Sequence, residues 1–221
     1  MAEPELTDLL PRDVLDRPST EVAPDLLGCV LEHESPDGLV AVMLTEVEAY
    51  TGQTDPASHA YRGRTARNAV MFGPAGHAYV YFTYGMHFCV NVVCMPAGTA
   101  SAVLLRAGKV IAGETLACAR RTSAAGVRPA DRELARGPAR LCQALGIDRG
   151  LDGADLCAAD SELRLRRGVA TARSEGKSLI RTGPRVGVRE GADVPWRFWL
   201  DGEPSVSVYR PHPRKTATSP G

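Results

Sequence analysis

Two glutamates stand two positions apart in the segment LTEVEAYTG, residues 44–52. The surrounding residues are typical of a half-buried strand, in which side chains alternate between two faces, so we expect Leu44, Glu46, Glu48 and Tyr50 to share one face. Neighbours on one face of a strand are roughly 6.6 Å apart, near the low end of the carboxylate spacing in inverting glycosidases. The pair therefore admits two interpretations. One is a hydrolase that uses both carboxylates; the other is a structural carboxylate bound to an arginine or a helix N-terminus, beside an exposed one.

A cluster of tyrosines lies in the segment YVYFTYG, residues 79–85, although aromatic residues make up only 5% of the chain. Strand alternation places Tyr79 and Tyr81 on one face, and we expect Tyr79 to pack in the core. Tyr84 is expected at the tip of a β-hairpin, where its side chain would be exposed. Because flat aromatic rings can stack on nucleic-acid bases or wedge between them, this hairpin is a candidate nucleic-acid contact.

Two further polar residues are candidates for a binding pocket. His59 lies in a polar loop, and Asn91 is flanked by valines in a predicted strand. A buried amide needs hydrogen-bond partners, so Asn91 either bonds within the core or discriminates between ligands. The spacings of histidine and cysteine match no metal-binding pattern, and the six cysteines include no CxxC pair. We therefore expect no metal site and free thiols.

The charge of the chain is strongly polarised, although the net charge is zero. Residues 1–60 contain thirteen acidic and two basic residues, whereas residues 61–221 contain twenty-four basic and thirteen acidic ones. Almost all of the bases are arginine, whose planar fork suits phosphate contacts, so the basic part is either a nucleic-acid surface or solvated surface charge. No apolar run approaches the ~18 residues of a membrane span, and the N-terminal residues do not read as a secretory signal. We expect a cytoplasmic protein, which would be associated with the nucleoid if the basic part binds DNA.

The pattern of predicted elements favours an α+β fold. We expect a single mixed domain over residues 1–221, with a largely antiparallel sheet, flanking helices and a protruding, tyrosine-bearing β-hairpin, because strands and helices do not alternate regularly. A long polar loop, residues 51–77, is of a length that is usually functional. The predicted elements are a helix within 20–31, a strand over 38–50, a hairpin over 78–94, a strand over 100–108, helices over 110–121 and 136–148, an irregular stretch over 149–182, strands over 183–188 and 195–210, and flexible tails over about 1–14 and 211–221.

Several segments, in this order, are similar to a known family: TEVEAYTGQTDPASHAYRGRTARNAVMFGPAGHAYVYFTYGMHFCVNVV, SAVLLRAG, ARGPARLCQALGID and GPRVGV…PWRFWLDG…SVSVYR. From about residue 15 to 210 the chain resembles the alkyladenine (3-methyladenine) DNA glycosylases. The resemblance implies a monomeric enzyme without metal or organic cofactor. It would bind duplex DNA, flip a damaged purine into a pocket and hydrolyse its N-glycosidic bond, since a base inside the stack cannot be attacked.

The resemblance also implies roles for individual residues. Glu48 would be the general base, with Arg106 and the carbonyl of Val186 helping to hold the attacking water. The pocket for the flipped base would be formed by Tyr50, Ala57, His59, Tyr81 and Asn91.

Contacts to DNA outside the pocket are implied in the same way. Tyr84 would fill the hole left in the duplex. The other expected DNA contacts are Met86 at the hairpin and Arg64, Thr65 and Arg67 at phosphates. Ala66 departs from the family pattern, which has proline there, and this puts the rigidity of that loop in doubt.

An alkylated purine such as 3-methyladenine is cationic, so it is already a good leaving group and can stack between tyrosine rings, worth on the order of 0.5–2 kcal/mol each. The motif region contains no lysine, which argues against a Schiff-base lyase and for an abasic product with an intact strand. Two alternatives stay open: a small-nucleoside glycosidase that uses both glutamates, and a non-catalytic nucleic-acid-binding module.

Overall fold

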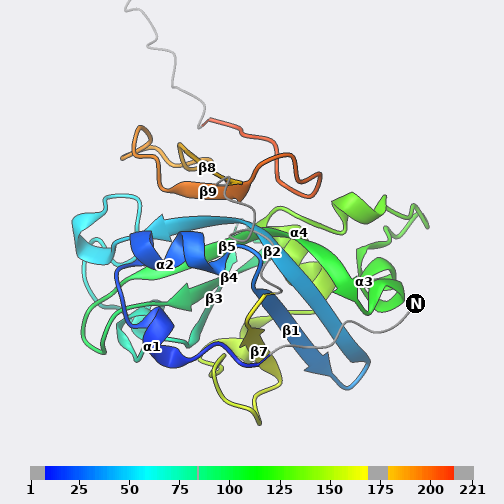
Figure 1. Cartoon of the computed structure of the whole chain (residues 1–221), viewed down its shortest axis with the longest axis horizontal. Coiled ribbons are helices and arrows are strands. Elements are labelled where there is room, and N and C mark those ends of the chain that lie inside the picture. The colour runs from blue at the N-terminus through cyan, green and yellow to red at the C-terminus, as the bar shows by residue number, and fades with distance from the viewer. Residues whose placement is uncertain (1–7, 84, 169–178, 212–221) are drawn as a thin grey trace, which may run out of the picture.

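The computed structural model describes residues 8–83, 85–168 and 179–211 (Figure 1). A nine-stranded sheet runs through these residues in the order β3-β4-β5-β2-β1-β7, with β6 paired to β5, and β9 paired to both β2 and β8. Every described pairing is antiparallel, so the predicted α+β fold with a largely antiparallel sheet is confirmed. The strands are β1 Val30–Ser35, β2 Gly38–Tyr50, β3 Ala78–Thr83, β4 His87–Val93, β5 Ala102–Ala112, β6 Ala135–Arg136, β7 Leu163–Arg166, β8 Ile180–Gly183 and β9 Arg197–Leu200.

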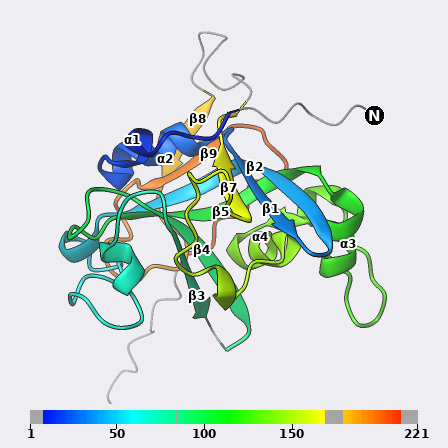
Figure 2. The same ribbon diagram turned by 90° about the horizontal axis from the view of Figure 1, so that it is seen from below.

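Within the described ranges, four α-helices flank the sheet: α1 Arg12–Leu15, α2 Ser19–Leu26, α3 Glu114–Arg121 and α4 Pro138–Leu145 (Figure 2). Short 3-10 helices lie at η1 Gly52–Thr54, η2 Ala69–Phe72, η3 Asp131–Glu133 and η4 Arg149–Leu151. The prediction for α4 is confirmed, because Pro138 occupies its first turn and Gly146 ends it with a left-handed φ of 73°. None of the described helices has both the length and the apolar character that a membrane span requires.

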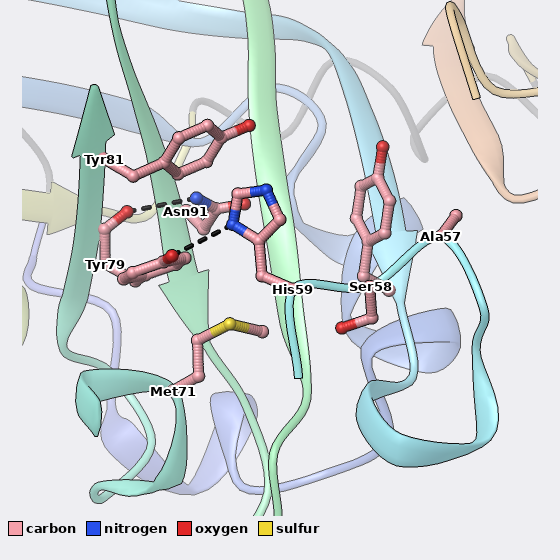
Figure 3. A pocket seen from close by; sticks show the side chains of 8 residues that line it. Ala57, Ser58, His59, Met71, Tyr79, Tyr81 and Asn91 are labelled. Carbon is pink, nitrogen blue, oxygen red and sulfur yellow. Dashed lines mark hydrogen bonds between the residues drawn. The ribbon is translucent and has the colours of Figure 1, made fainter. Parts of the chain in front are cut away.

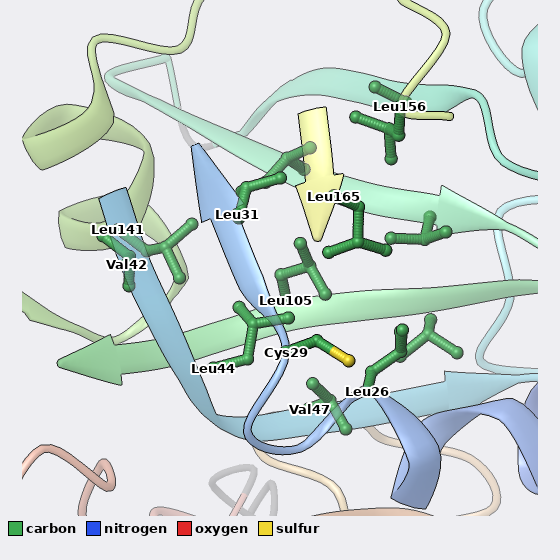
Figure 4. Packing of buried hydrophobic residues seen from close by; sticks show 14 of the residues in the cluster. Leu26, Cys29, Leu31, Val42, Leu44, Val47, Leu105, Leu141, Leu156 and Leu165 are labelled. Atoms are coloured by element: carbon green, nitrogen blue, oxygen red, sulfur yellow. The ribbon is translucent and has the colours of Figure 1, made fainter. Parts of the chain in front are cut away.

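The central strand β2 makes contacts along its whole length. Its residues 38–43 pair with β1 and residues 46–48 with β9 along one edge, while β5 pairs along the other. The main hydrophobic core lies against this strand and takes in α2, α4, β1 and β7 (Figure 4). The two glutamates of β2 are therefore enclosed by β5 on one side and β9 on the other.

The alternation along β2 is interrupted, which corrects one prediction. Leu44 and Val47 both pack in the main core, although their odd spacing would place them on opposite faces of a regular strand. The register with β5 shifts between Leu44 and Glu46, so Thr45 is an extra residue in a β-bulge. The prediction that Leu44 and Glu46 share a face is therefore wrong. Glu46 and Glu48 do lie together, on the face opposite to this core.

A second shift in the same ladder lies on β5. The pairing passes from Glu46–Ala107 to Val47–Leu105 and leaves Arg106 without an opposite residue. Bulges change the direction of side chains and are common beside active sites. Here Leu105 stays in the core, and Arg106 points to the face that carries the two glutamates.

Other differences from the predicted elements have local causes. Residues 8–14 are not a tail, because Leu10 is buried and α1 begins at residue 12. The strand expected over 100–108 continues to Ala112, and the helix after it begins only at Glu114. Strand β7 falls in the stretch predicted to be irregular, and residues 184–188 form a loop instead of a strand. The tail expected over 211–221 lies outside the described residues, apart from residue 211.

Gly52, where the long loop leaves β2, offers a test of the fold. Its φ is 72°, and a Cβ there would lie 1.9 Å from the carbonyl oxygen of Ala100. Gly63 has a similar φ of 89° but open space around it. We expect Gly63→Ala to lower the free energy of unfolding by about 1–2 kcal/mol and Gly52→Ala by clearly more. Urea unfolding of both variants measures this, and equal losses would show that the close approach to Ala100 has no cost.

Candidate active site

Glu46 and Glu48 form the centre of the candidate site, and both side chains are fully buried. Arg106 of β5 lies between them. Its Nε donates a hydrogen bond to Oε1 of Glu46 at 2.8 Å, and its Nη1 lies 3.3 Å from Oε2 of Glu48. Although burial alone would lower the pKa of Arg106, the two carboxylates outweigh it and hold that pKa above its usual value. Arg106 therefore stays charged and compensates both carboxylates.

Glu46 accepts from two further residues besides Arg106. Arg197 of β9 donates from Nε to Oε1 at 2.7 Å, and Ser207 donates from its backbone N–H to Oε2 at 2.7 Å and from its hydroxyl to Oε1 at 2.9 Å. Burial alone would raise the pKa of the Glu46 carboxyl, but Arg106, Arg197 and Ser207 together lower it. This environment matches the interpretation of Glu46 as a structural carboxylate.

Glu48 has different partners, each of which also faces a cavity. The hydroxyl of Tyr50 donates to Oε2 at 2.9 Å, and the backbone N–H of Val186 donates to Oε1 at 2.7 Å. The Val186 contact was not predicted, since the resemblance implied a role for its carbonyl. With Arg106, the described residues place three donor groups at Glu48, two at Oε2 and one at Oε1.

Tyr50, a partner of Glu48, lines an aromatic cavity of about 70 Å³. Figure 3 shows this cavity with seven of its lining residues labelled. His59 and Tyr81 meet edge to face, with ring centroids 4.4 Å apart, and Tyr79 lies 5.5 Å from Tyr81. The structure brings together all five residues predicted for the base pocket, and it adds three that were not predicted. The lining residues are Tyr50, Ala57, Ser58, His59, Met71, Tyr79, Tyr81 and Asn91.

Hydrogen bonds fix the polar groups of this cavity. Nδ1 of His59 lies 2.9 Å from the hydroxyl of Tyr79, and the side-chain amide of Asn91 donates to the Tyr79 carbonyl at 3.0 Å. Asn91 thus bonds within the sheet, as the first of its two interpretations expects, and it also lines the cavity. Tyr79 packs in a second small core, as predicted, and its hydroxyl is the group that sequence analysis overlooked.

The aromatic cavity carries no net charge at neutral pH. Burial raises the pKa of Tyr79 to about 12 and also raises the pKa values of Tyr50 and Tyr81, so all three hydroxyls stay protonated. The pKa of His59 is lowered by desolvation of its inner side and by the nearby charge of Arg67, although the ring is exposed at the cavity mouth. The cavity therefore offers rings and hydroxyls, without a counter-ion of its own.

A second cavity, of about 330 Å³, lies on the other side of Glu48. Arg106 and Val186 line it, so two of the three partners of Glu48 face this space. The remaining lining residues are mostly charged or polar: Glu133, Arg136, Arg140, Ser207, Val208 and Arg210. Glu133 pairs with both Arg136 and Arg140. Glu48 thus lies between an uncharged aromatic cavity and a cationic one.

Comparison with known proteins places the chain in a family. A family model described as Methylpurine-DNA glycosylase (MPG) matches residues 13–204. The chain belongs to the methylpurine-DNA glycosylase family. It is accordingly a DNA glycosylase, an enzyme that hydrolyses N-glycosidic bonds. The family predicted from the sequence is confirmed, and the interpretation as a non-catalytic binding module loses its support.

Bacterial relatives resemble the chain over nearly its whole length. A protein of Streptomyces avermitilis with the description "Putative 3-methyladenine DNA glycosylase" is 55% identical, and the match covers 99% of this chain and 100% of that protein. Proteins with the same description from Leifsonia xyli subsp. xyli and Burkholderia lata are 55% and 47% identical. Those matches cover 91% and 90% of this chain, and 93% and 91% of the relatives.

The part of the long loop that was predicted to contact phosphates is exposed at Arg64, Thr65 and Arg67. Asn68 holds this loop, because its side-chain amide donates to the carbonyls of His59 and Gly63 at 2.9 and 3.0 Å. Arg67 turns back, since its guanidinium lies 5.8 Å from the centroid of the Tyr81 ring. The loop is thereby coupled to the aromatic cavity.

At the hairpin of β3 and β4, Met86, predicted to contact DNA, is 70% exposed. Tyr84, predicted to enter the duplex, lies outside the described residues.

Glu46→Gln tests the structural role of this carboxylate. We expect a loss of about 3–5 kcal/mol in the free energy of unfolding at pH 7, because the substitution leaves two buried arginines poorly compensated. The lowered pKa of Glu46 in the folded protein means that its contribution is present above the unfolded value of about 4.5 and disappears as the pH falls. The difference in stability between wild type and variant should therefore shrink in acid, and urea unfolding from pH 7 to pH 4 measures it. A difference that is the same at both pH values would contradict this role.

Proposed function

We propose that this glycosylase removes alkylated purines from duplex DNA by flipping the base into the aromatic cavity, and that a water activated by Glu48 hydrolyses the N-glycosidic bond. The observation that supports this most directly is the position of Glu48. It is a fully buried carboxylate whose partners line the aromatic cavity on one side and the arginine-lined cavity on the other. A base in the first cavity would place its sugar next to Glu48.

The uncharged aromatic cavity suits a purine that alkylation has made cationic. Such a base gains cation–π attraction from Tyr50 and Tyr81, on the order of 0.5–2 kcal/mol for each ring. Because the pKa values of both phenols are raised, neither ring ionises to compete with Glu48 as a base. The positive charge also weakens the glycosidic bond, so no general acid is required for the leaving group.

The chemical step then needs only water and a base. The bond between C1′ and the purine nitrogen breaks, and its electron pair neutralises the cationic purine. The sugar passes through an oxocarbenium-like state, which the Glu48 carboxylate stabilises. Water forms the new bond to C1′ and transfers its proton to Glu48.

A lyase reaction is not part of this proposal. Schiff-base chemistry needs an amine nucleophile. Among the residues that the structure describes, Lys109 is the one lysine. It is exposed on β5 and lines neither of the two cavities beside Glu48. The product should therefore be an abasic site in an intact strand.

Release of methylpurines from methylated duplex DNA tests the proposed reaction. Glu48→Gln should lower the single-turnover rate by about 10²–10⁴-fold, because the amide cannot accept the proton. Glu162→Gln is the control, since Glu162 is exposed and distant from β2 along the chain, and it should leave the rate unchanged. Loss of release in Glu46→Gln but not in Glu48→Gln would show that Glu46 is the base and that the proposed assignment to Glu48 is wrong. Strand cleavage without added amine or alkali would exclude a purely hydrolytic enzyme.

Tyr84→Ala separates base flipping from the chemical step. If Tyr84 fills the space left by the flipped base, the variant should lose at least about tenfold in rate on methylated duplex DNA. On methylated single-stranded DNA, where no stack has to be opened, it should match the wild type. Equal rates of variant and wild type on duplex DNA would rule out the wedge.

A further inference from the structure

The side chain of Arg185 is among the largest fully buried side chains in the described part of the molecule, although it lies in the loop after β8. It forms a bidentate ion pair with Asp55: Nη1 donates to Oδ2 at 2.5 Å and Nη2 donates to Oδ1 at 2.9 Å. Nη1 also donates to the carbonyl of Ala49, the residue between Glu48 and Tyr50, at 3.0 Å. The guanidinium lies 4.6 Å from the centroid of the Tyr50 ring and 5.2 Å from that of Trp196.

Three parts of the site are connected to this ion pair. Tyr50, one wall of the aromatic cavity, stacks on Arg185. Ala57, another lining residue, donates its backbone N–H to Oδ1 of Asp55 at 3.0 Å. Val186 follows Arg185 in the chain and donates its N–H to Glu48 at 2.7 Å. Neither Arg185 nor Asp55 lines either of the two cavities beside Glu48, so the pair acts from behind the site.

We propose that Arg185 and Asp55 are positioning residues for the glycosylase reaction, which hold the Tyr50 wall, the Ala57 loop and the Val186 contact to Glu48 in one geometry. This rests on the proposed function of Glu48 and the aromatic cavity. The planar fork of arginine matches a carboxylate at two points, which a single ammonium group cannot do. The pair also joins segments that are distant in sequence, since its members are 130 positions apart. It therefore fixes two loops that have no strand pairing to each other.

The ion pair also sets the charge behind Tyr50. An unpaired guanidinium on the buried side of this ring would repel a cationic base on its cavity side. Asp55 neutralises Arg185, so the ring keeps its attraction for a cation. Arg185 and Asp55 should thus influence cationic and neutral lesions differently, which a merely structural ion pair would not do.

Arg185→Lys keeps the charge and removes the fork. Its control is Arg164→Lys. Arg164 lies on β7 and pairs with the fully buried Glu32 of the neighbouring strand β1, away from the site. We expect Arg185→Lys to lower the single-turnover release of 7-methylguanine by about 100-fold, as small displacements of reacting groups do. Its dissociation constant for duplex DNA with an abasic-site analogue should stay within threefold of the wild type. Arg164→Lys should change neither value. A rate within threefold of the wild type, or equal losses in both variants, would overturn the proposal.

Amide exchange without DNA tests the same idea independently of catalysis. In Arg185→Lys the backbone N–H groups of Val186 and Ala57 should exchange at least about tenfold faster, while those of β1 and β7 should not change. Unchanged exchange at both amides would overturn the proposal even if the enzyme proves inactive. Failure of the wild type to release any base would instead overturn the proposed function, so the two failures are distinguishable.

Asp55→Asn tests the charge argument. It should lower the release of cationic 7-methylguanine about 3–10-fold more than that of neutral hypoxanthine. The combined variant Arg185→Met with Asp55→Asn removes both charges. It should restore the ratio of the two rates to the wild-type ratio, while both rates stay low. If Asp55→Asn does not fold, the combined variant decides, because a ratio different from that of the wild type would overturn the charge argument.

Discussion

Two neighbouring carboxylates on one strand face, both removed from solvent, are the constraint on which the rest of this structure depends. Burying one uncompensated carboxylate costs several kcal/mol, and burying two side by side adds their mutual repulsion. A positive charge must therefore lie between them, and only a cation directed at the same face of β2 can do so. The bulge on β5 directs Arg106 to that face. The bulge on β2 brings both glutamates to the same face, while Leu44 before the bulge and Val47 after it both pack in the core.

The same arrangement separates the two glutamates in function. Glu46 is held by four donor groups, from two arginines and both polar groups of Ser207. Glu48 has three, and they come from groups at cavity walls. Because Arg106 touches both, the charge that stabilises Glu46 also compensates Glu48. A structural carboxylate thereby fixes the arginine that accompanies the proposed reactive one.

Sequence reasoning succeeded where the deciding information was local. The ends of α4 follow from Pro138 and Gly146, and the extent of β2 follows from its β-prone residues. It failed at Thr45, where the core positions shift from Val42 and Leu44 to Val47, because a bulge is set by the register with another strand and a regular alternation was assumed. The ion pair of Arg185 was also missed, since its partner Asp55 is distant in sequence. Asp55 lies in the predicted long loop, whereas residues 183–188 were predicted to be a strand. The five residues predicted for the base pocket came from family resemblance, and spacing alone would not have joined them.

The proposed site has a consequence for how alkylated purines are distinguished from normal ones. The aromatic cavity contains no counter-ion, so a cationic base gains only the attraction of the rings, on the order of 0.5–2 kcal/mol for each. One such increment at its upper end changes a binding constant by roughly 30-fold, which is modest beside the excess of normal bases in DNA. The stronger selection lies in the chemical step, because the proposed site provides a base for water but no group that protonates a neutral purine from the Glu48 side. A neutral purine that enters the cavity would therefore be released much more slowly than a cationic one, and the reactivity of the lesion itself supplies most of the discrimination.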